Sequence, residues 1–203
     1  MKKIVLLAIV AMAAIGVNAQ GLQFGVRGGL NLSTESKNKS IELLSDNKFK
    51  TGLHIGGVAN YTFNDRFELE GDLLYSLQGY KDCIYFTADA QTVISKDHYV
   101  NSHYLNLPIA VKYHFFKGAY IEFGPQFGLL LAKKDKLEGV ETENAFPSES
   151  TKKFDFGLLG GLGYKFENGI FVDARYVHGF TGTSKLYDGG KNRNIQLSLG
   201  YLF

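Results

Sequence analysis

The sequence predicts an all-β fold, an eight-stranded antiparallel up-and-down transmembrane β-barrel with short periplasmic turns and long extracellular loops. Three observations support it: the chain divides into segments that alternate apolar and polar residues, one face of every segment lacks charge, and tight and long connections alternate. Because successive side chains of a strand point to opposite faces, such segments can turn one face to lipid and the other to a lumen. The last segment shows the alternation best, with Ile195, Leu197, Leu199, Tyr201 and Phe203 on one face.

The predicted strands have the length of about ten residues that a membrane-spanning strand needs, and they occupy residues 22–32, 51–63, 67–78, 103–115, 119–131, 154–166, 170–178 and 194–203. Three connections are tight and contain the turn-forming residues Asn, Asp or Gly; they are residues 64–66, 116–118 and 167–169. The other four are long and polar, at residues 33–50, 79–102, 132–153 and 179–193. Since outer-membrane barrels keep their short turns in the periplasm, both termini of the mature chain are expected there.

One face of all eight segments is apolar and carries no Asp, Glu, Lys or Arg, although these residues make up 21% of the chain. A Lys or Arg on the lipid face at mid-bilayer would cost about 2–4 kcal/mol, which explains their absence. Aromatic residues gather at the turn ends of the segments and are expected to form a girdle at the periplasmic interface. Its predicted members are Tyr61, Phe63, Phe67, Tyr113, Phe115, Phe116, Tyr120, Tyr164, Phe166, Phe171, Tyr201 and Phe203.

The opposite face carries charges of both signs and is expected to line the lumen. An eight-stranded barrel is only wide enough for its own side chains, so these charges should pack as a network of ion pairs and not line a channel. A proton-conducting or substrate-binding role for the same cluster is the alternative. The predicted lumen charge network is Arg27, Glu68, Glu70, Asp72, Lys112, Glu122, Asp155, Lys165, Asp173 and Arg175.

The N-terminus predicts export. It has a basic start, a short apolar run and small residues before the cut, so residues 1–19 are expected to be a cleaved signal peptide and residues 20–203 the barrel domain. The apolar run is too short for a transmembrane helix, which needs roughly 20 residues. The chain has 22 Lys and Arg against 20 Asp and Glu, and two of the lysines lie in the signal peptide. The mature chain therefore has no basic surplus that would indicate nucleic acid.

The C-terminal strand and the composition indicate how the barrel assembles. Leu199, Tyr201 and Phe203 resemble the terminal signal that the barrel-assembly machinery reads, so this machinery and outer-membrane lipid are expected partners. Cys83 is the single cysteine, which excludes a disulfide framework within the chain. An intermolecular bridge through it stays open beside an ordinary loop cysteine. We expect the barrel to be a monomer.

The sequence contains no arrangement that predicts catalysis, a metal site or a cofactor. Ser102 and His103 are neighbours in a predicted strand, so their side chains point to opposite faces and cannot share a proton directly. His178 and Ser184 form a second Ser and His pair at the rim without a third group to orient them. We therefore expect that the protein is not an enzyme. The alternative is a lipid-modifying enzyme with its site at the rim.

Several longer runs carry a resemblance to a known family. They are Tyr104-Leu-Asn-Leu-Pro-Ile-Ala-Val-Lys-Tyr113, Gly124-Pro-Gln-Phe-Gly128, Asp155-Phe-Gly-Leu-Leu-Gly-Gly-Leu-Gly-Tyr164 and Arg175-Tyr-Val-His-Gly179. With these runs the mature chain resembles the PorT-like outer-membrane β-barrel family, within the porin-type barrels of the cell envelope. The resemblance implies an integral outer-membrane barrel, and the member that names the family is linked to protein secretion. Pro108 and Pro125 lie inside predicted strands of these runs, where each is expected to require a β-bulge.

The long loops are the surface expected to meet the outside. Loop 79–102 holds two β-prone runs, residues 84–86 and 92–94, that could extend the third and fourth strands into a hairpin with an exposed edge for a partner strand. Loop 132–153 is rich in Lys and Glu and is the second expected contact surface. The function expected is a structural or surface-interaction role linked to secretion or adhesion. The alternative is an exported soluble barrel that binds an apolar ligand, which would need the opposite phase of apolar and polar faces.

Overall fold

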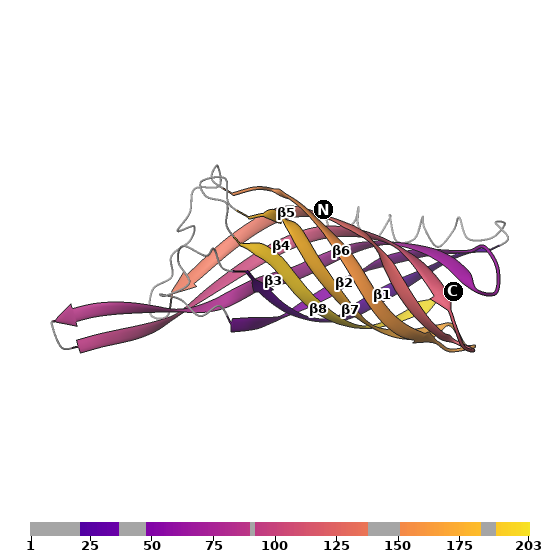
Figure 1. The fold of residues 1–203 in the computed structure, drawn as a ribbon, viewed down its shortest axis with the longest axis horizontal. Coiled ribbons are helices and arrows are strands. Elements are labelled where there is room, and N and C mark those ends of the chain that lie inside the picture. The colour runs from indigo at the N-terminus through magenta and orange to yellow at the C-terminus, as the bar shows by residue number, and fades with distance from the viewer. Residues whose placement is uncertain (1–20, 37–47, 90–91, 138–150, 184–189) are drawn as a thin grey trace, which may run out of the picture.

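The computed structural model describes residues 21–36, 48–89, 92–137, 151–183 and 190–203, so the predicted signal peptide lies outside the described residues. Eight strands form a closed antiparallel barrel in sequence order, and β1 pairs with β8 to complete it (Figure 1). The predicted fold class is confirmed. The strands are β1 (Leu22–Glu35), β2 (Lys48–Thr62), β3 (Phe67–Asp89), β4 (Thr92–His114), β5 (Ala119–Leu137), β6 (Phe154–Lys165), β7 (Ile170–Gly182) and β8 (Lys191–Leu202).

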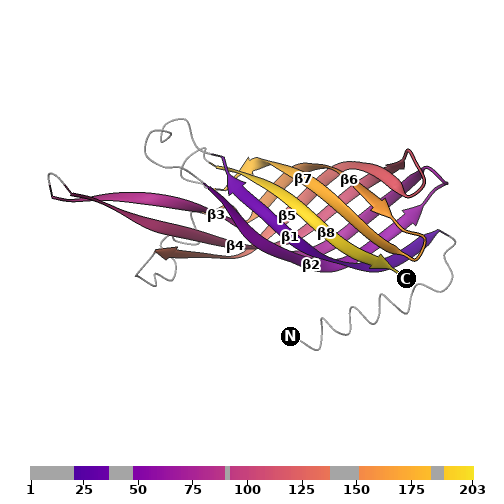
Figure 2. The ribbon, with the colours of Figure 1, turned by 90° about the horizontal axis from the view of Figure 1, so that it is seen from below.

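Three tight turns close one end of the barrel, between β2 and β3, β4 and β5, and β6 and β7, where the sequence predicts them. In the first, the Asn64 side-chain oxygen accepts hydrogen bonds from the backbone N–H of Arg66 at 2.9 Å and of Phe67 at 3.0 Å. The other two turns each need a left-handed residue, and Gly118 and Gly169 supply it with φ of 78° and 84°. The C-terminus lies at this end of the barrel (Figure 2).

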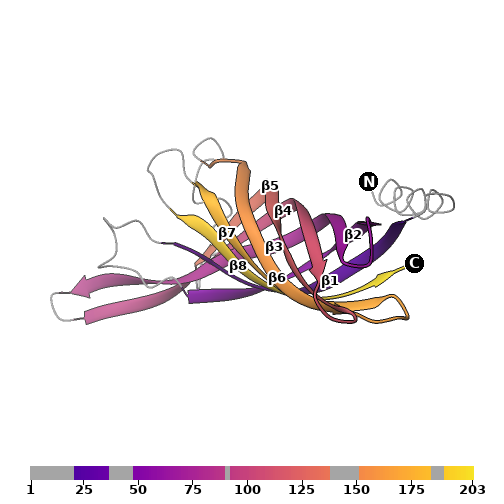
Figure 3. The ribbon, with the colours of Figure 1, turned by 45° about the vertical axis from the view of Figure 1, so that its right-hand side comes forward.

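At the opposite end, β3 and β4 continue far beyond the other strands as a long two-stranded hairpin, which Figures 1 and 3 show projecting away from the barrel. Their pairing runs without a break from Gly79↔Asn101 to Thr87↔Val93. The expected hairpin extension is therefore confirmed, and most of the predicted loop 79–102 is strand. The β-prone runs in this segment explain the difference, because backbone pairing does not stop where the bilayer ends.

The two faces of the barrel have the predicted phase. Exposed apolar side chains cover the outside; Leu53 is 60%, Ile55 66% and Leu199 60% exposed. Polar and charged side chains fill the inside, where Arg27 is 1% and Glu70 1% exposed. This is the reverse of a soluble barrel with an apolar lumen, so that alternative is wrong. Among the described residues, we find no helix with the length and apolarity to cross a membrane.

The predicted bulges at Pro108 and Pro125 are wrong. On either side of Pro108 the β3–β4 ladder keeps one register, with Gly71↔Ile109 and Leu74↔Asn106. Pro125 pairs with Leu158 in a β5–β6 ladder that has no register shift. Pairing can lapse locally at a proline because the flanking pairs hold the register, and no extra residue is needed. The β4–β5 ladder does shift, but at His103/Tyr104, toward the extracellular end.

Gly200 gives a first testable prediction, because its lumen face is filled by an aromatic ring. A Cβ added there would lie 2.1 Å from Cζ of Phe171, whereas one added to Gly71 would meet no atom within 4 Å. We expect Gly200→Ala to destabilise the barrel by about 1–3 kcal/mol through overpacking, and Gly71→Ala to have little effect. Urea unfolding in detergent micelles, followed by the gel mobility of folded and unfolded forms, measures both. Equal stability of the two variants would contradict the prediction.

Candidate functional site

Two arginines from opposite ends of the sequence form the centre of the lumen. Arg27 of β1 pairs with Asp72 of β3, with Glu70 at 2.9 Å and with Asp173 at 2.7 Å. Arg175 of β7 binds Glu70 at 2.6 Å and Asp72 at 2.7 Å. The two acids Glu70 and Asp72 therefore each bridge both arginines. All these side chains are at most 1% exposed, so the interactions are shielded from water.

Seven of the ten predicted lumen charges are joined in this way. Glu122 of β5 accepts two hydrogen bonds from Arg175, at 2.7 Å and 2.8 Å. Lys112 of β4 joins through Glu70. The cluster contains three cations and four carboxylates, drawn from β1, β3, β4, β5 and β7. We call these seven residues the central cluster: Arg27, Glu70, Asp72, Lys112, Glu122, Asp173 and Arg175.

Two aromatic residues belong to the lumen and not to the girdle. Tyr120 and Phe171 are each 1% exposed, so their placement in the periplasmic aromatic girdle is wrong. The Lys112 ammonium lies 4.4 Å from the centre of the Tyr120 ring, and the Arg27 guanidinium 4.9 Å from that of Phe171. The rings provide cation–π contacts and fill the space beside the charges. The sequence held a signal for this, because Tyr120 shares a strand face with Glu122.

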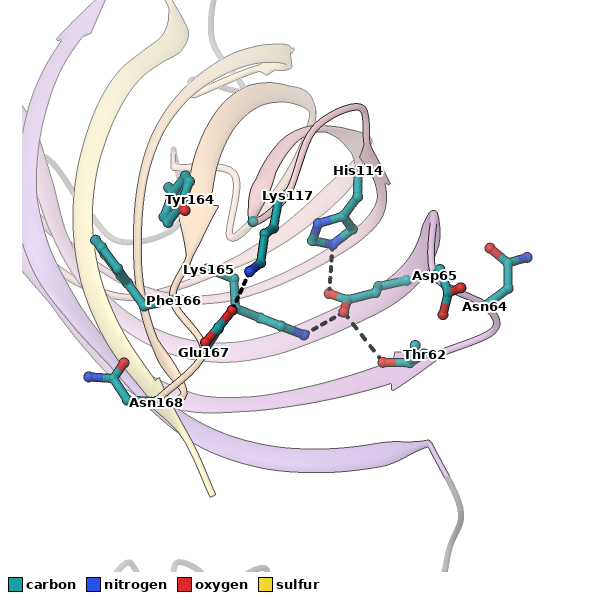
Figure 4. Close-up of a pocket in the computed structure, with 12 residues that line it drawn as sticks. Thr62, Asn64, Asp65, His114, Lys117, Tyr164, Lys165, Phe166, Glu167 and Asn168 are labelled. Carbon is teal, nitrogen blue, oxygen red and sulfur yellow. Dashed lines mark hydrogen bonds and ion pairs between the residues drawn. The ribbon is translucent and has the colours of Figure 1, made fainter.

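A second charged group lies at the end with the tight turns, around Glu68. Lys165 donates to Glu68, Thr62 Oγ1 lies 3.4 Å from the same carboxylate, and His114 Nε2 is 3.3 Å from its other oxygen. Thr62, His114 and Lys165 point toward one place in the mouth of the barrel (Figure 4). They line a cavity of about 620 Å³ that opens toward the turns. We call this cavity the periplasmic vestibule. Two of the ten predicted charges, Glu68 and Lys165, line it.

The extracellular half of the lumen is mostly neutral. Asn31 donates to Ser76 at 2.9 Å, and its side-chain oxygen lies 2.9 Å from His54 Nδ1. His54 Nε2 is 3.1 Å from Ser198 Oγ. The tenth predicted charge, Asp155, lies apart from the other nine and accepts a hydrogen bond from Asn192 at 2.9 Å. Hydrogen-bonded amides and hydroxyls can fill this half without the desolvation cost of further charges.

The structure does not build a nucleophile site at the extracellular rim. Ser102 is 8% exposed and points inward, whereas His103 faces outward and meets the Tyr75 hydroxyl. His178 is also outward, with its Nδ1 3.3 Å from the Tyr176 hydroxyl. Its suggested partner Ser184 lies outside the described residues. Within the described residues neither histidine is therefore placed to activate a serine.

Aromatic side chains occupy both ends of the outer face. At the turn end they form neighbouring pairs, such as Tyr61–Phe63 with ring centres 4.9 Å apart and Tyr164–Phe166 at 4.8 Å. Tyr201 and Phe203 of the predicted assembly signal belong to this band and, like Leu199, are exposed. A second band at the extracellular end, not predicted from the sequence, contains Phe127, Phe154, Phe156, Tyr176 and Phe180. Aromatic belts at both interfaces are typical of transmembrane barrels.

A closed eight-stranded barrel with an apolar exposed face, a charged buried lumen and aromatic bands at both ends is an integral outer-membrane β-barrel protein. Residues 18–185 match the model of the outer membrane protein beta-barrel domain, and the chain belongs to this family. No curated protein sequence matches the chain.

The chain is also similar to solved structures of outer-membrane proteins, of which Neisserial surface protein A, with a TM-score above 0.5, supports the fold. Neisserial surface protein A is 16% identical, with a TM-score of 0.55 over 90% of this chain and 99% of that protein. Ail, the attachment invasion locus protein of Yersinia pestis, is 15% identical with a TM-score of 0.45 over 90% and 99% of the two chains. OprG from Pseudomonas aeruginosa is 11% identical with a TM-score of 0.43 over 90% and 96%. At these identities the similarity concerns the fold alone.

Proposed function

We propose that this outer-membrane barrel is a surface-interaction protein, without enzymatic activity, that presents its β3–β4 hairpin to a partner outside the cell. The observation that carries the proposal is the reach of this hairpin beyond the barrel. Within the described residues, β2 pairs with β3 as far as Lys48↔Lys81, and β5 pairs with β4 as far as His98↔Leu137. The β3–β4 ladder itself continues to Asp89↔Thr92.

The edges of the hairpin suggest how a partner would bind. Over residues 83–89 of β3 and 92–97 of β4, no other strand of the described chain pairs with the hairpin. Each strand therefore presents backbone N–H and C=O groups along one side. An extended segment of another protein can add to such an edge by β-augmentation, in which main-chain hydrogen bonds supply affinity. The predicted contact through loop 132–153 remains part of the proposal.

The packed lumen supports a binding role over transport. The central cluster spans five strands and is buried, and an eight-stranded barrel is filled by its own side chains. On this proposal the charges hold the barrel rigid so that the hairpin has a fixed base, and neither protons nor solutes cross. The protein would act as a monomer, after insertion by the barrel-assembly machinery through Leu199, Tyr201 and Phe203.

The type of surface role is the finer part of the proposal. The runs at residues 104–113 and 155–164 resemble those of the PorT-like family, and this likeness favours a role in protein secretion. An adhesive role rests on the hairpin alone. Secretion predicts that the partner is another envelope protein, and adhesion predicts that it lies on a foreign surface.

Replacement of residues 83–97 by Asn-Gly tests the hairpin. This dipeptide forms a tight two-residue turn and leaves the Asp82↔His98 pair in place. We expect the variant to reach the outer membrane in normal amount and to keep its heat-dependent gel mobility. Either cell adhesion should fall to the level of cells that lack the protein, or the set of secreted proteins should become that of such cells. Adhesion and secretion that both stay at the wild-type level would contradict the proposal.

A second variant is the matched control. It replaces residues 138–150, in the other predicted contact loop, by a short Gly-Ser linker and leaves the hairpin intact. If the hairpin is the main contact element, this variant retains most of the activity that the hairpin variant loses. Equal losses in the two variants would assign the contact to the whole extracellular end, and loss in the control alone would overturn the role of the hairpin.

A further inference from the structure

Cationic side chains lie on the outer face of β8 at its extracellular end. Arg193 is exposed and is paired with His178 of β7 on one side and Thr34 of β1 on the other. Asn192 points into the lumen, where it bonds Asp155. By the alternation of a strand, the exposed Lys191 therefore shares the outer face with Arg193. Two fixed cations and a histidine thus face outward together.

Arg193 lies at the depth of lipid headgroups. It lies ten positions before Phe203, which is 59% exposed in the aromatic band at the periplasmic end. A tilted transmembrane strand needs about 9–11 residues to cross the hydrocarbon core. If Phe203 marks one interface, Arg193 marks the other. Between them, the outward residues of β8 are Ile195, Leu197, Leu199 and Tyr201, all apolar or aromatic.

An aromatic surface continues from this point along the barrel. The His178 ring meets Phe180 edge-on, with centres 5.2 Å apart. Phe180 lies 6.2 Å from Phe156 of β6, which lies 5.5 Å from Phe127 of β5. Phe180 is 45% exposed. The rings form an unbroken apolar path across three strands, immediately beside the cations.

The side chains that the structure describes on the outer face of β5 to β8 include no acid. Among the side chains that the structure describes on β5 to β8, the acids are Glu122, Asp155 and Asp173. Glu122 and Asp173 are buried in the central cluster, and Asp155 bonds Asn192 in the lumen. The guanidinium of Arg193 therefore has no described carboxylate on its own face of these four strands. Its exposed side chain can contact an anionic group of the membrane.

We propose that this surface binds a lipid of the outer leaflet with a phosphorylated headgroup. Arg193 donates two parallel hydrogen bonds to a phosphate, and Lys191 adds a second charge beside it. An acyl chain of the same lipid lies along Phe180, Phe156 and Phe127. Charge and position both select this occupant, because a soluble anion would gain nothing from the aromatic path and a neutral lipid nothing from the cations.

Native mass spectrometry of the full mature protein in detergent tests the proposal with diphosphorylated lipid A and its enzymatically dephosphorylated form as probes. We expect the wild type to prefer the phosphorylated lipid. The double variant Arg193→Gln/Lys191→Gln should bind it about fivefold more weakly for each cation removed and should bind the dephosphorylated lipid unchanged. Excess inorganic phosphate should not displace the lipid. Phe180→Ser should weaken both lipids.

The matched control removes two exposed cations from the opposite end, as Arg66→Gln/Lys117→Gln, with the same change in net charge. It should bind both lipids like the wild type. Equal affinity of the wild type for the two lipids would overturn the proposal. An equal loss in the control would also overturn it, because the cations would then attract anionic lipid only non-specifically. Displacement by inorganic phosphate would replace the lipid by a free-anion site. Heat-dependent gel mobility verifies that every variant compared is folded.

Discussion

Replacement of Arg175 by Met is expected to destabilise the barrel by about 3–5 kcal/mol. Arg175 binds Glu70, Asp72 and Glu122, all within 2.8 Å, and is 1% exposed in its side chain. Without it, four buried carboxylates share the remaining cations Arg27 and Lys112. A buried carboxylate without a partner loses hydration and gains nothing in return. Urea unfolding in micelles should therefore show a lower midpoint, with less folded protein in the outer membrane of producing cells.

Three companion variants separate this effect from simple loss of packing. Arg175→Lys keeps the charge but cannot reproduce the bonds from three nitrogens, so its loss should be intermediate. Addition of Glu122→Gln to Arg175→Met removes one orphaned charge, and the double variant should be more stable than the two separate losses predict. Lys117→Met breaks the exposed pair with Glu167, where the side chains are 79% and 82% exposed, and should cost less than about 1 kcal/mol. If the stability losses of Arg175→Met and Glu122→Gln simply added in the double variant, the two residues would not belong to a coupled network.

The fold could be predicted from the sequence because one physical requirement repeats along every strand. Lipid rejects charge, so the phase of each strand is set by residues such as Glu122, whose face must be the lumen. The same reasoning places Tyr120 and Phe171 inside, since each lies two residues before a lumen acid, Glu122 and Asp173. Both residues lie close to a turn, which is typical of girdle aromatics, but the alternation of the strand decides which face they occupy.

The pairing within the lumen could not be predicted in the same way. Arg27 of β1 meets Asp173 of β7, 146 residues away in sequence, because the barrel closes with a particular stagger between strands. Local alternation fixes a face but not a height on the barrel wall. The strands β3 and β4 exceed their predicted lengths for a related reason. The bilayer sets a minimum strand length, whereas β3 and β4 continue as far as their backbones remain hydrogen-bonded to each other.

The lipid face makes the second large prediction. Leu197 lies on β8 between Leu30 of β1 and Ala174 of β7, is 49% exposed, and is six residues from the terminal Phe203, near mid-bilayer. Leu197→Arg is expected to destabilise the inserted barrel by about 2–4 kcal/mol, because the guanidinium must stay in hydrocarbon or distort the bilayer to reach water. Unfolding titrations in lipid vesicles measure this loss. In cells, the amount of folded protein in the outer membrane should fall while unfolded mature protein accumulates in the periplasm.

Depth provides the control for this prediction. Thr51 is exposed on the same outer face, at the extracellular end of β2, where it pairs with Leu32 of β1. Thr51→Arg puts an identical charge where headgroups and water can solvate it, and the loss should be no more than about 1 kcal/mol. Leu197→Ala removes apolar area without adding charge and should lie between the two. If both arginine variants were equally stable, the outer face would not be in contact with hydrocarbon at Leu197. The native Arg193 lies four residues from Leu197 on the same face, so we expect the boundary between tolerated and excluded charge to lie between these two positions.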